Sequence, residues 1–154
     1  MFEDVLFSVA DGVGKATLNR PAQLNALTLD MVRALDDKLA EWAKDKSIRA
    51  VMIFGAGDKA FCAGGDVRAL YEAGKAGNRA LLRDFFWHEY RMNYRIATYP
   101  KTLIAVMDGL VMGGGAGIGL NAPVRVATER AIFSMPECSI GLYPDVGAGH
   151  FLQR

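Results

Sequence analysis

Two glycine-rich segments are the first residues of this chain whose types and spacing suggest chemistry. One spans residues 61–66 (FCAGGD) and the other residues 108–117 (DGLVMGGGAG). Glycine adopts backbone conformations that other residues avoid and lets a ligand approach the main chain closely. Where such a segment opens a helix, free N–H groups favour negative charge. Each segment alone is more often a tight turn, but two that converge could offer two donors to one developing oxyanion.

Two carboxylates further along the chain could act as acid, base or nucleophile. Glu137 follows Pro136, and Asp145 lies eight residues later. Each has an ordinary explanation, because Ser134 and Glu137 have capping-box spacing and Asp145 could cap a helix expected at the end of the chain. Taken singly, each is more often a cap than a catalyst. Beside two converging glycine loops, the pair predicts carboxylate chemistry next to an oxyanion hole.

Composition and motifs argue against several other classes of function. Eighteen basic and seventeen acidic residues leave a formal net charge of +1, so we expect neither nucleic-acid nor membrane binding. No stretch approaches the ~18 apolar residues of a membrane span. There is no P-loop, and the nearest dinucleotide-binding pattern ends at Pro123 and lacks a strand immediately before it. The two cysteines fit neither a disulfide framework nor a zinc site, and no metal is expected.

The elements that must position these residues alternate between strands and helices. This pattern predicts a single α/β domain whose parallel sheet is buried on both faces. The N-terminus is expected to form a β-hairpin closed at Pro21, and Thr28 to cap an amphipathic helix that begins at Leu29. Residues 60–66 are expected to be a loop. Strands are expected at 49–54, 102–107, 124–128 and 131–134, helices at 67–72, 78–98, 112–121 and 147–154, and a helical turn at 136–140.

From about Val5 to its last residue, the chain resembles the crotonase (enoyl-CoA hydratase/isomerase) superfamily. The matching segments, in order, are residues 19–21 (NRP), 25–27 (NAL), 60–66 (AFCAGGD) and 108–115 (DGLVMGGG). The resemblance implies that residues 1–154 form a β-β-α spiral core, incomplete at the C-terminus, that binds an acyl-CoA thioester. It also implies an oxyanion hole made by the amides of Gly65 and Gly114. The substrate-binding residues implied for the CoA are Gln23, Asn25, Ala26, Ala63, Gly64, Asp66 and Val67.

The acidic residues point to one branch of this superfamily. Hydratases of the family carry one glutamate in the helix after the glycine triplet and another after a later proline. Here the first position is Gly117 and the second is Glu137, while Asp145 stands where hydratases usually have glycine. With residues 85–90 (FFWHEY) and 141–147 (GLYPDVG), this exchange is similar to the 3-hydroxyisobutyryl-CoA hydrolase branch, which cleaves a thioester in valine degradation.

The resemblance to this branch implies roles for three acidic residues. Glu137 would activate water or attack the thioester itself, Asp145 would orient the water or share the proton, and Glu89 would hydrogen-bond the acyl hydroxyl. A hydratase or isomerase of the same fold, and an inactive CoA-binding or assembly module, stay open as alternatives. No cofactor is expected beyond the CoA of the substrate. A homo-oligomer and association with a missing C-terminal part are both open, and the lack of a recognisable signal or presequence predicts a cytoplasmic protein.

Overall fold

A hairpin at the N-terminus begins a five-stranded sheet in the computed structural model, which describes residues 4–153. The predicted hairpin is confirmed: β1 (Val5–Ala10) pairs antiparallel with β2 (Val13–Leu18). The other three strands run parallel to β2, in the sheet order β1-β2-β3-β5-β7. They are β3 (Ala50–Gly55), β5 (Thr102–Met107) and β7 (Val124–Ala127).

A smaller parallel sheet lies beyond the ends of these strands, in the order β4-β6-β8. Its strands are β4 (Ala60–Cys62), β6 (Leu110–Met112) and β8 (Ile132–Ser134). The prediction of a loop at residues 60–66 was wrong in its first half, and β6 was not predicted. A strand of three residues is too short to show an alternating pattern. Each short strand directly follows a strand of the large sheet, which produces the expected β-β-α spiral.

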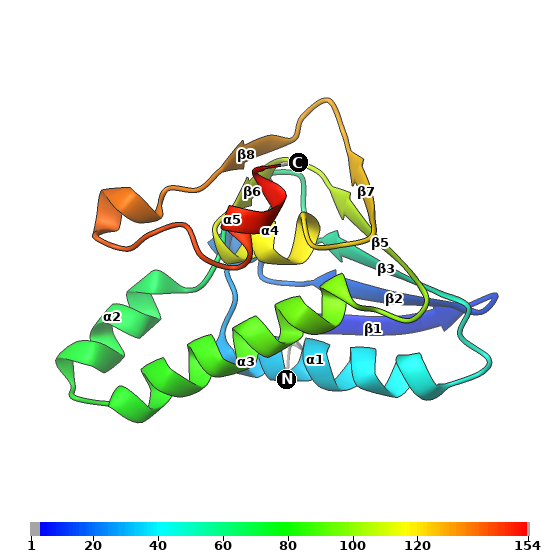
Figure 1. The fold of residues 1–154 in the computed structure, drawn as a ribbon, viewed down its shortest axis with the longest axis horizontal. Helices are drawn as coiled ribbons and strands as arrows, with labels where there is room; N and C mark the ends of the chain where they lie inside the picture. Colours follow the sequence, from blue (N-terminus) through cyan, green and yellow to red (C-terminus); the bar gives the residue numbers. More distant parts are fainter. Residues whose placement is uncertain (1–3, 154) are drawn as a thin grey trace.

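Helices cover one side of the large sheet and the space between the sheets. Figure 1 shows α1 (Leu29–Lys44) and α3 (Arg79–Ala97) side by side below the sheet. The Thr28 hydroxyl accepts a hydrogen bond from the Met31 amide at 3.2 Å, so its predicted role as the N-cap of α1 is confirmed. The remaining elements are α2 (Val67–Lys75), α4 (Gly114–Gly119), α5 (Ala148–Phe151), and two 3₁₀ turns, η1 (Pro21–Gln23) and η2 (Glu137–Ile140).

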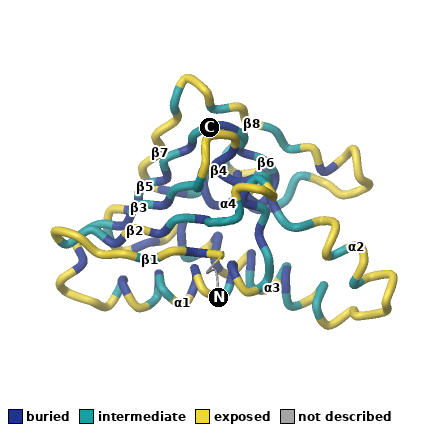
Figure 2. Tube along the Cα trace, turned by 180° about the vertical axis from the view of Figure 1, so that it is seen from behind, coloured by how far each residue is buried: buried dark blue, intermediate teal, exposed yellow. Residues whose placement is uncertain are grey.

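The hydrophobic core lies between the two long helices and the large sheet. Its largest fully buried side chains include Leu35 and Leu39 from α1, Ile96 from α3 and Leu103 from β5. The expectation that the strands are buried on both faces was wrong at the sheet edges. All four residues of β7 are exposed (Figure 2), and most residues of the edge strands β1 and β8 are exposed as well. Among residues 4–153, no helix has the length and apolar character needed to cross a bilayer.

Candidate active site

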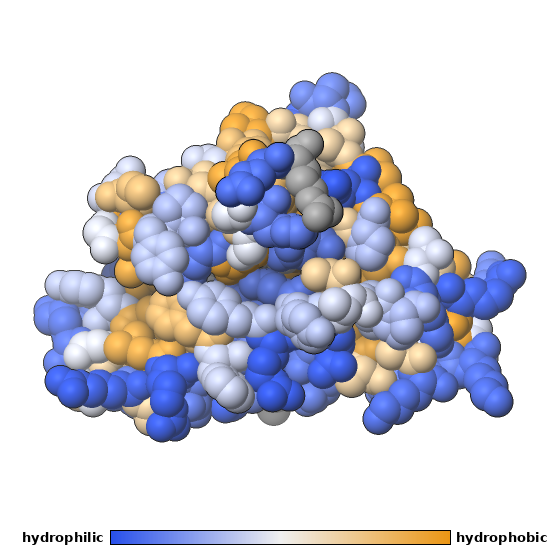
Figure 3. All heavy atoms as spheres, viewed as in Figure 1, coloured by the Kyte–Doolittle hydropathy of each residue, from blue (hydrophilic) through white to orange (hydrophobic). Residues whose placement is uncertain are grey.

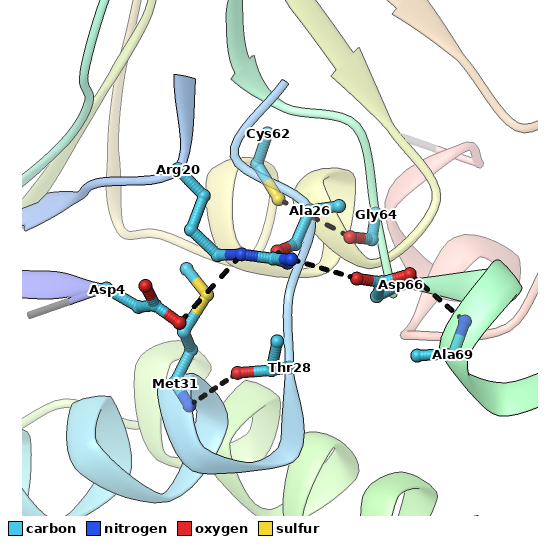
Figure 4. A network of polar contacts seen from close by, with 9 residues as sticks. All are labelled: Asp4, Arg20, Ala26, Thr28, Met31, Cys62, Gly64, Asp66 and Ala69. Atoms are coloured by element: carbon cyan, nitrogen blue, oxygen red, sulfur yellow. Dashed lines mark hydrogen bonds and ion pairs between the residues drawn. The ribbon is translucent and has the colours of Figure 1, made fainter. Parts of the chain in front are cut away.

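The first glycine loop is supported from the segment that follows β2. Asn25 is fully buried, and its Nδ2 donates to the carbonyls of Ala56 and Ala60 at 2.9 and 2.8 Å. Its Oδ1 accepts from the Arg20 amide at 3.0 Å. The Arg20 guanidinium in turn donates to the Ala26 carbonyl at 2.6 Å (Figure 4). These bonds join the start of β4 to the 20–26 segment, so the backbone leading into the loop has a defined position.

Asp66 holds the other end of the same loop. Its carboxylate accepts from the Arg20 guanidinium at 3.1 Å and from the Ala69 amide at 3.2 Å, so it caps α2 (Figure 4). Leu27 forms a parallel bridge with Gly65, through bonds of 2.8 and 2.9 Å to the residues on either side of that glycine. Because the flanking residues make these bonds, the amide of Gly65 itself points away from Leu27.

The second glycine loop supplies another amide at the same place. Gly114 is the first residue of α4, so its N–H has no acceptor within the helix. A Cβ atom on Gly114 would lie 3.3 Å from the Gly65 nitrogen, and one on Gly64 would lie 3.2 Å from the Gly114 nitrogen. The structure therefore brings the two loops into contact, as the family resemblance implied, and glycine is what allows this close approach.

A cavity of about 930 Å³ opens beside these two amides. Its walls come from α2, α3 and the segment around η2, and apolar side chains dominate them. Figure 3 shows this apolar surface between α2 and α3. The apolar lining includes Leu70, Leu82, Phe85, Phe86, Ile140 and Leu142. Of the residues predicted to form the site, the cavity is lined by Ala63, Gly64, Gly65, Val67, Glu89, Gly114, Glu137 and Asp145.

Three carboxylates from three different elements face this cavity. Glu89 comes from α3, Glu137 from η2, and Asp145 from the loop before α5. Burial raises the pKa of Glu89 to about 8, and the nearby charges of Asp145 and Glu137 add to this effect. Burial also raises the pKa of Glu137, with a smaller contribution from Asp145. Low solvation and repulsion from the neighbouring charges therefore favour the protonated form of Glu89 at neutral pH.

The acidic side chains lie directly against the glycine loops. A Cβ atom on Gly114 would come 2.2 Å from Oε1 of Glu89, and one on Gly113 would come 3.0 Å from Oε1 of Glu137. Both carboxyl groups therefore occupy space that any side chain at these glycines would need. The two carboxyl groups and the amides of Gly65 and Gly114 therefore border the same cavity.

Neither catalytic candidate has the capping role that its local sequence also suggested. η2 has no side-chain cap, so Ser134 and Glu137 do not form a capping box, and α5 begins after Gly147 without a side-chain cap. Asp145 instead accepts a hydrogen bond of 2.5 Å from the Tyr90 hydroxyl. Burial and this bond raise the pKa of the Tyr90 phenol. Tyr90 lies in the 85–90 segment that resembles the hydrolase branch, but it was not among the predicted site residues, because 55 positions separate it from Asp145 and no local pattern connects them.

Four of the predicted substrate-binding residues do not line the cavity. They are Gln23, Asn25, Ala26 and Asp66. Asn25 and Asp66 make the supporting contacts described above, whereas Gln23 is exposed in η1. Cys62 is fully buried, and desolvation raises its pKa to about 12, which makes it a poor nucleophile. Within the described part of the chain, no group of three or more His, Cys, Asp or Glu side chains is arranged to hold a metal ion.

Comparison with known proteins gives matches over nearly the whole chain. A mitochondrial 3-hydroxyisobutyryl-CoA hydrolase of Danio rerio is 53% identical over 151 residues, which are 98% of this chain and 39% of that protein. The small ribosomal subunit protein mS47 of Neurospora crassa is 46% identical, over 99% of this chain and 30% of its own length. The solved structure of a carnitinyl-CoA dehydratase from Mycobacterium thermoresistibile superposes with a TM-score of 0.96 at 49% identity, over 99% of this chain and 45% of that one.

The chain thus spans about two fifths of the length of the 3-hydroxyisobutyryl-CoA hydrolases that it matches. The sequence profile described as enoyl-CoA hydratase/isomerase matches residues 13–154. The β-β-α spiral and the solved structures agree with that assignment. The chain therefore belongs to the enoyl-CoA hydratase/isomerase family.

Proposed function

We propose that this chain provides the catalytic core of a hydrolase for a short-chain 3-hydroxyacyl-CoA thioester, with 3-hydroxyisobutyryl-CoA as its substrate. The observation that carries the proposal is the convergence of two free amides and three carboxylates on one cavity. Relatives named 3-hydroxyisobutyryl-CoA hydrolase, at 48–53% identity, favour this substrate over other thioesters. Products would be the free 3-hydroxy acid and CoA, with one water consumed.

In this proposal, the thioester oxygen accepts hydrogen bonds from the amides of Gly65 and Gly114. Addition of an oxygen nucleophile to the carbonyl carbon places negative charge on that oxygen, and removing one such donor typically costs ~3–4 kcal/mol of barrier. Glu137 either removes a proton from the attacking water or attacks the carbonyl itself to form an anhydride that water then opens. The thiolate of CoA leaves when the tetrahedral intermediate collapses, and it takes up a proton.

The other two carboxyl groups have complementary tasks in the proposed reaction. Because the pKa of Glu89 is about 8, this residue is largely protonated at neutral pH and can donate a hydrogen bond to the acyl hydroxyl. Asp145, held by the Tyr90 hydroxyl, orients the water or shares its proton with Glu137. The apolar walls receive the acyl and pantetheine parts. Arg68 and Lys75, which also line the cavity, offer positive charge to the phosphates of CoA.

Hydration of a double bond is the second candidate, because the carnitinyl-CoA dehydratase structure resembles this chain closely. One feature of the site disfavours it. The helix position at which family hydratases have a glutamate is Gly117, and a Cβ atom there would lie 2.7 Å from Val146 Cβ and 2.9 Å from Asn93 Nδ2. No carboxylate fits at that position, so one of the two acid–base groups of a hydratase has no counterpart here.

A third candidate, an assembly module, is suggested by the match to the ribosomal protein mS47. The carboxylate cluster disfavours this role, because buried acidic groups with raised pKa values that line a cavity are typical of catalytic sites. A cytoplasmic location, expected from the sequence, also stays a proposal, since the hydrolase relatives are named as mitochondrial.

Release of free thiol by the complete protein tests the proposed reaction. With 3-hydroxyisobutyryl-CoA we expect rapid thiol release, and with crotonyl-CoA we expect neither thiol release nor loss of the enoyl absorbance. Glu137→Gln and Asp145→Asn should each lose most of the turnover and keep the affinity for CoA. Glu129→Gln, an exposed glutamate between β7 and β8, is the matched control. Hydration of crotonyl-CoA without thiol release would overturn the proposal.

A further inference from the structure

The turn that carries Asp145 has a backbone conformation unsuited to its sequence. The Ala148 amide donates to the Asp145 carbonyl at 2.7 Å, and both residues between them have positive φ, +43° at Val146 and +93° at Gly147. Such turns, of type I′, ordinarily have glycine, asparagine or aspartate at both central positions. Valine is β-branched, and a positive φ is costly for it, so the surrounding structure must hold this turn in place.

The side chain of Asn121 contacts this turn directly. Its Nδ2 donates to the carbonyls of Gly117 and Val146, each at 2.9 Å. The first bond satisfies a carbonyl near the C-terminus of α4, and the second fixes the peptide group that follows the strained residue. Val146 itself is buried over Gly117. Asn121 therefore anchors the turn to α4, the same helix whose first residue is Gly114.

The direction of the Asp145 side chain depends on this turn. Asp145 immediately precedes Val146, and its carboxylate reaches the Tyr90 hydroxyl on α3 at 2.5 Å and lines the cavity. Relaxation of Val146 to a negative φ would rotate the peptide groups next to Asp145 and move its carboxylate. The bond to Tyr90 alone leaves the backbone free to rotate, because it fixes only the end of a side chain.

We infer that Asn121 is a positioning residue that keeps the Asp145 carboxylate in the cavity by holding Val146 in its strained conformation. The inference rests on the proposed function only in assigning Asp145 a part in thioester hydrolysis. Asn121 is not among the residues that line this cavity, so in this inference it acts on Asp145 through the turn. Its removal should reduce turnover and leave substrate binding nearly intact.

The test combines Asn121→Ala with Val146→Gly in the complete protein. Asn121→Ala should lower kcat about 10- to 100-fold, because small displacements of a reacting group have effects of this size, and should change KM by less than about threefold. Glycine adopts a positive φ without strain, so Val146→Gly added to Asn121→Ala should raise kcat again by more than about threefold. Asn78→Ala, which removes one side-chain cap from α3, is the matched control and should keep its kcat.

A second measurement makes the inference independent of any substrate. The ¹³Cζ resonance of Tyr90, assigned with Tyr90→Phe, reports its hydrogen bond to Asp145. In Asn121→Ala it should move toward its position in Asp145→Asn, and it should return in the double variant. An unchanged resonance with an unchanged kcat, or further loss of kcat in the double variant, would overturn the inference. If the Tyr90 resonance behaves as expected but the complete protein releases no thiol, the proposed function is wrong. The positioning role of Asn121 is then still supported.

Discussion

Protonation of Glu89 should make the stability of the protein depend steeply on pH. The pKa of Glu89 is raised from 4.5 to about 8, first by burial and then by the charges of Asp145 and Glu137. Between these two values the folded state binds a proton that the unfolded state has lost, so the free energy of unfolding falls as pH rises. In this range, each rise of one pH unit lowers the free energy of unfolding by about 1.4 kcal/mol. Over the full interval, Glu89 should contribute a loss of about 5 kcal/mol, complete above pH ~8 and absent below pH ~4.

Glu89→Gln isolates this contribution, because glutamine has the shape of the neutral carboxyl group and cannot ionise. Urea unfolding of the complete protein, followed by circular dichroism from pH 4.5 to 8.5, gives the free energy at each pH. The difference between wild type and variant should change by several kcal/mol across this range, in favour of the variant at high pH. Glu129→Gln is the exposed control, and its free energy of unfolding should change with pH as that of wild type does. If the free energy of Glu89→Gln also changes with pH as in wild type, the reasoning about the buried carboxyl group is refuted.

Two further predictions concern packing and polar support at the site. Gly117→Ala should lower the free energy of unfolding by about 1–3 kcal/mol in urea titrations, since its Cβ would lie 2.7 Å from Val146 Cβ. Gly149→Ala, which meets no atom within 4 Å, should have little effect, and equal losses would contradict the argument. Asn25→Ala should lower the stability by about 2–3 kcal/mol in thermal unfolding, because the buried Ala60 carbonyl and the partly buried Ala56 carbonyl lose their donor. Gln23→Ala, on the exposed turn nearby, is the control. If Asn25→Ala lowers the stability as little as Gln23→Ala does, the hydrogen bonds of Asn25 do not support the loop.

The elements with strong local patterns could be predicted from the sequence. α1 has apolar residues at helical spacing and a threonine cap, and β5 is bounded by Pro100 and Asp108; its bounds match the prediction, residues 102–107. The glycine loops and the two carboxylates can also be recognised in the sequence. These features can be recognised because each depends on residues only a few positions apart, so their spacing in the sequence is informative.

Local sequence did not decide whether Glu137 and Asp145 cap helices or face the cavity. Glu137 and Asp145 have spacings that suit helix caps, and neither caps a helix in the structure. The local hydrogen bonds that a cap would make compete with contacts from elements far away in the chain. The Tyr90 hydroxyl on α3 donates a hydrogen bond to the Asp145 carboxylate, and the Glu137 carboxyl group lies against Gly113.

The sequence by itself determined the alternation of strands and helices, the residue types of the site and the places where glycine is required. Tertiary structure alone decided which segments meet, because the three-residue strands β4, β6 and β8 form only by pairing with one another. It also decided the protonation of Glu89. Its pKa depends on burial and on two charges carried by distant elements, and such long-range electrostatics leave no trace in a local pattern.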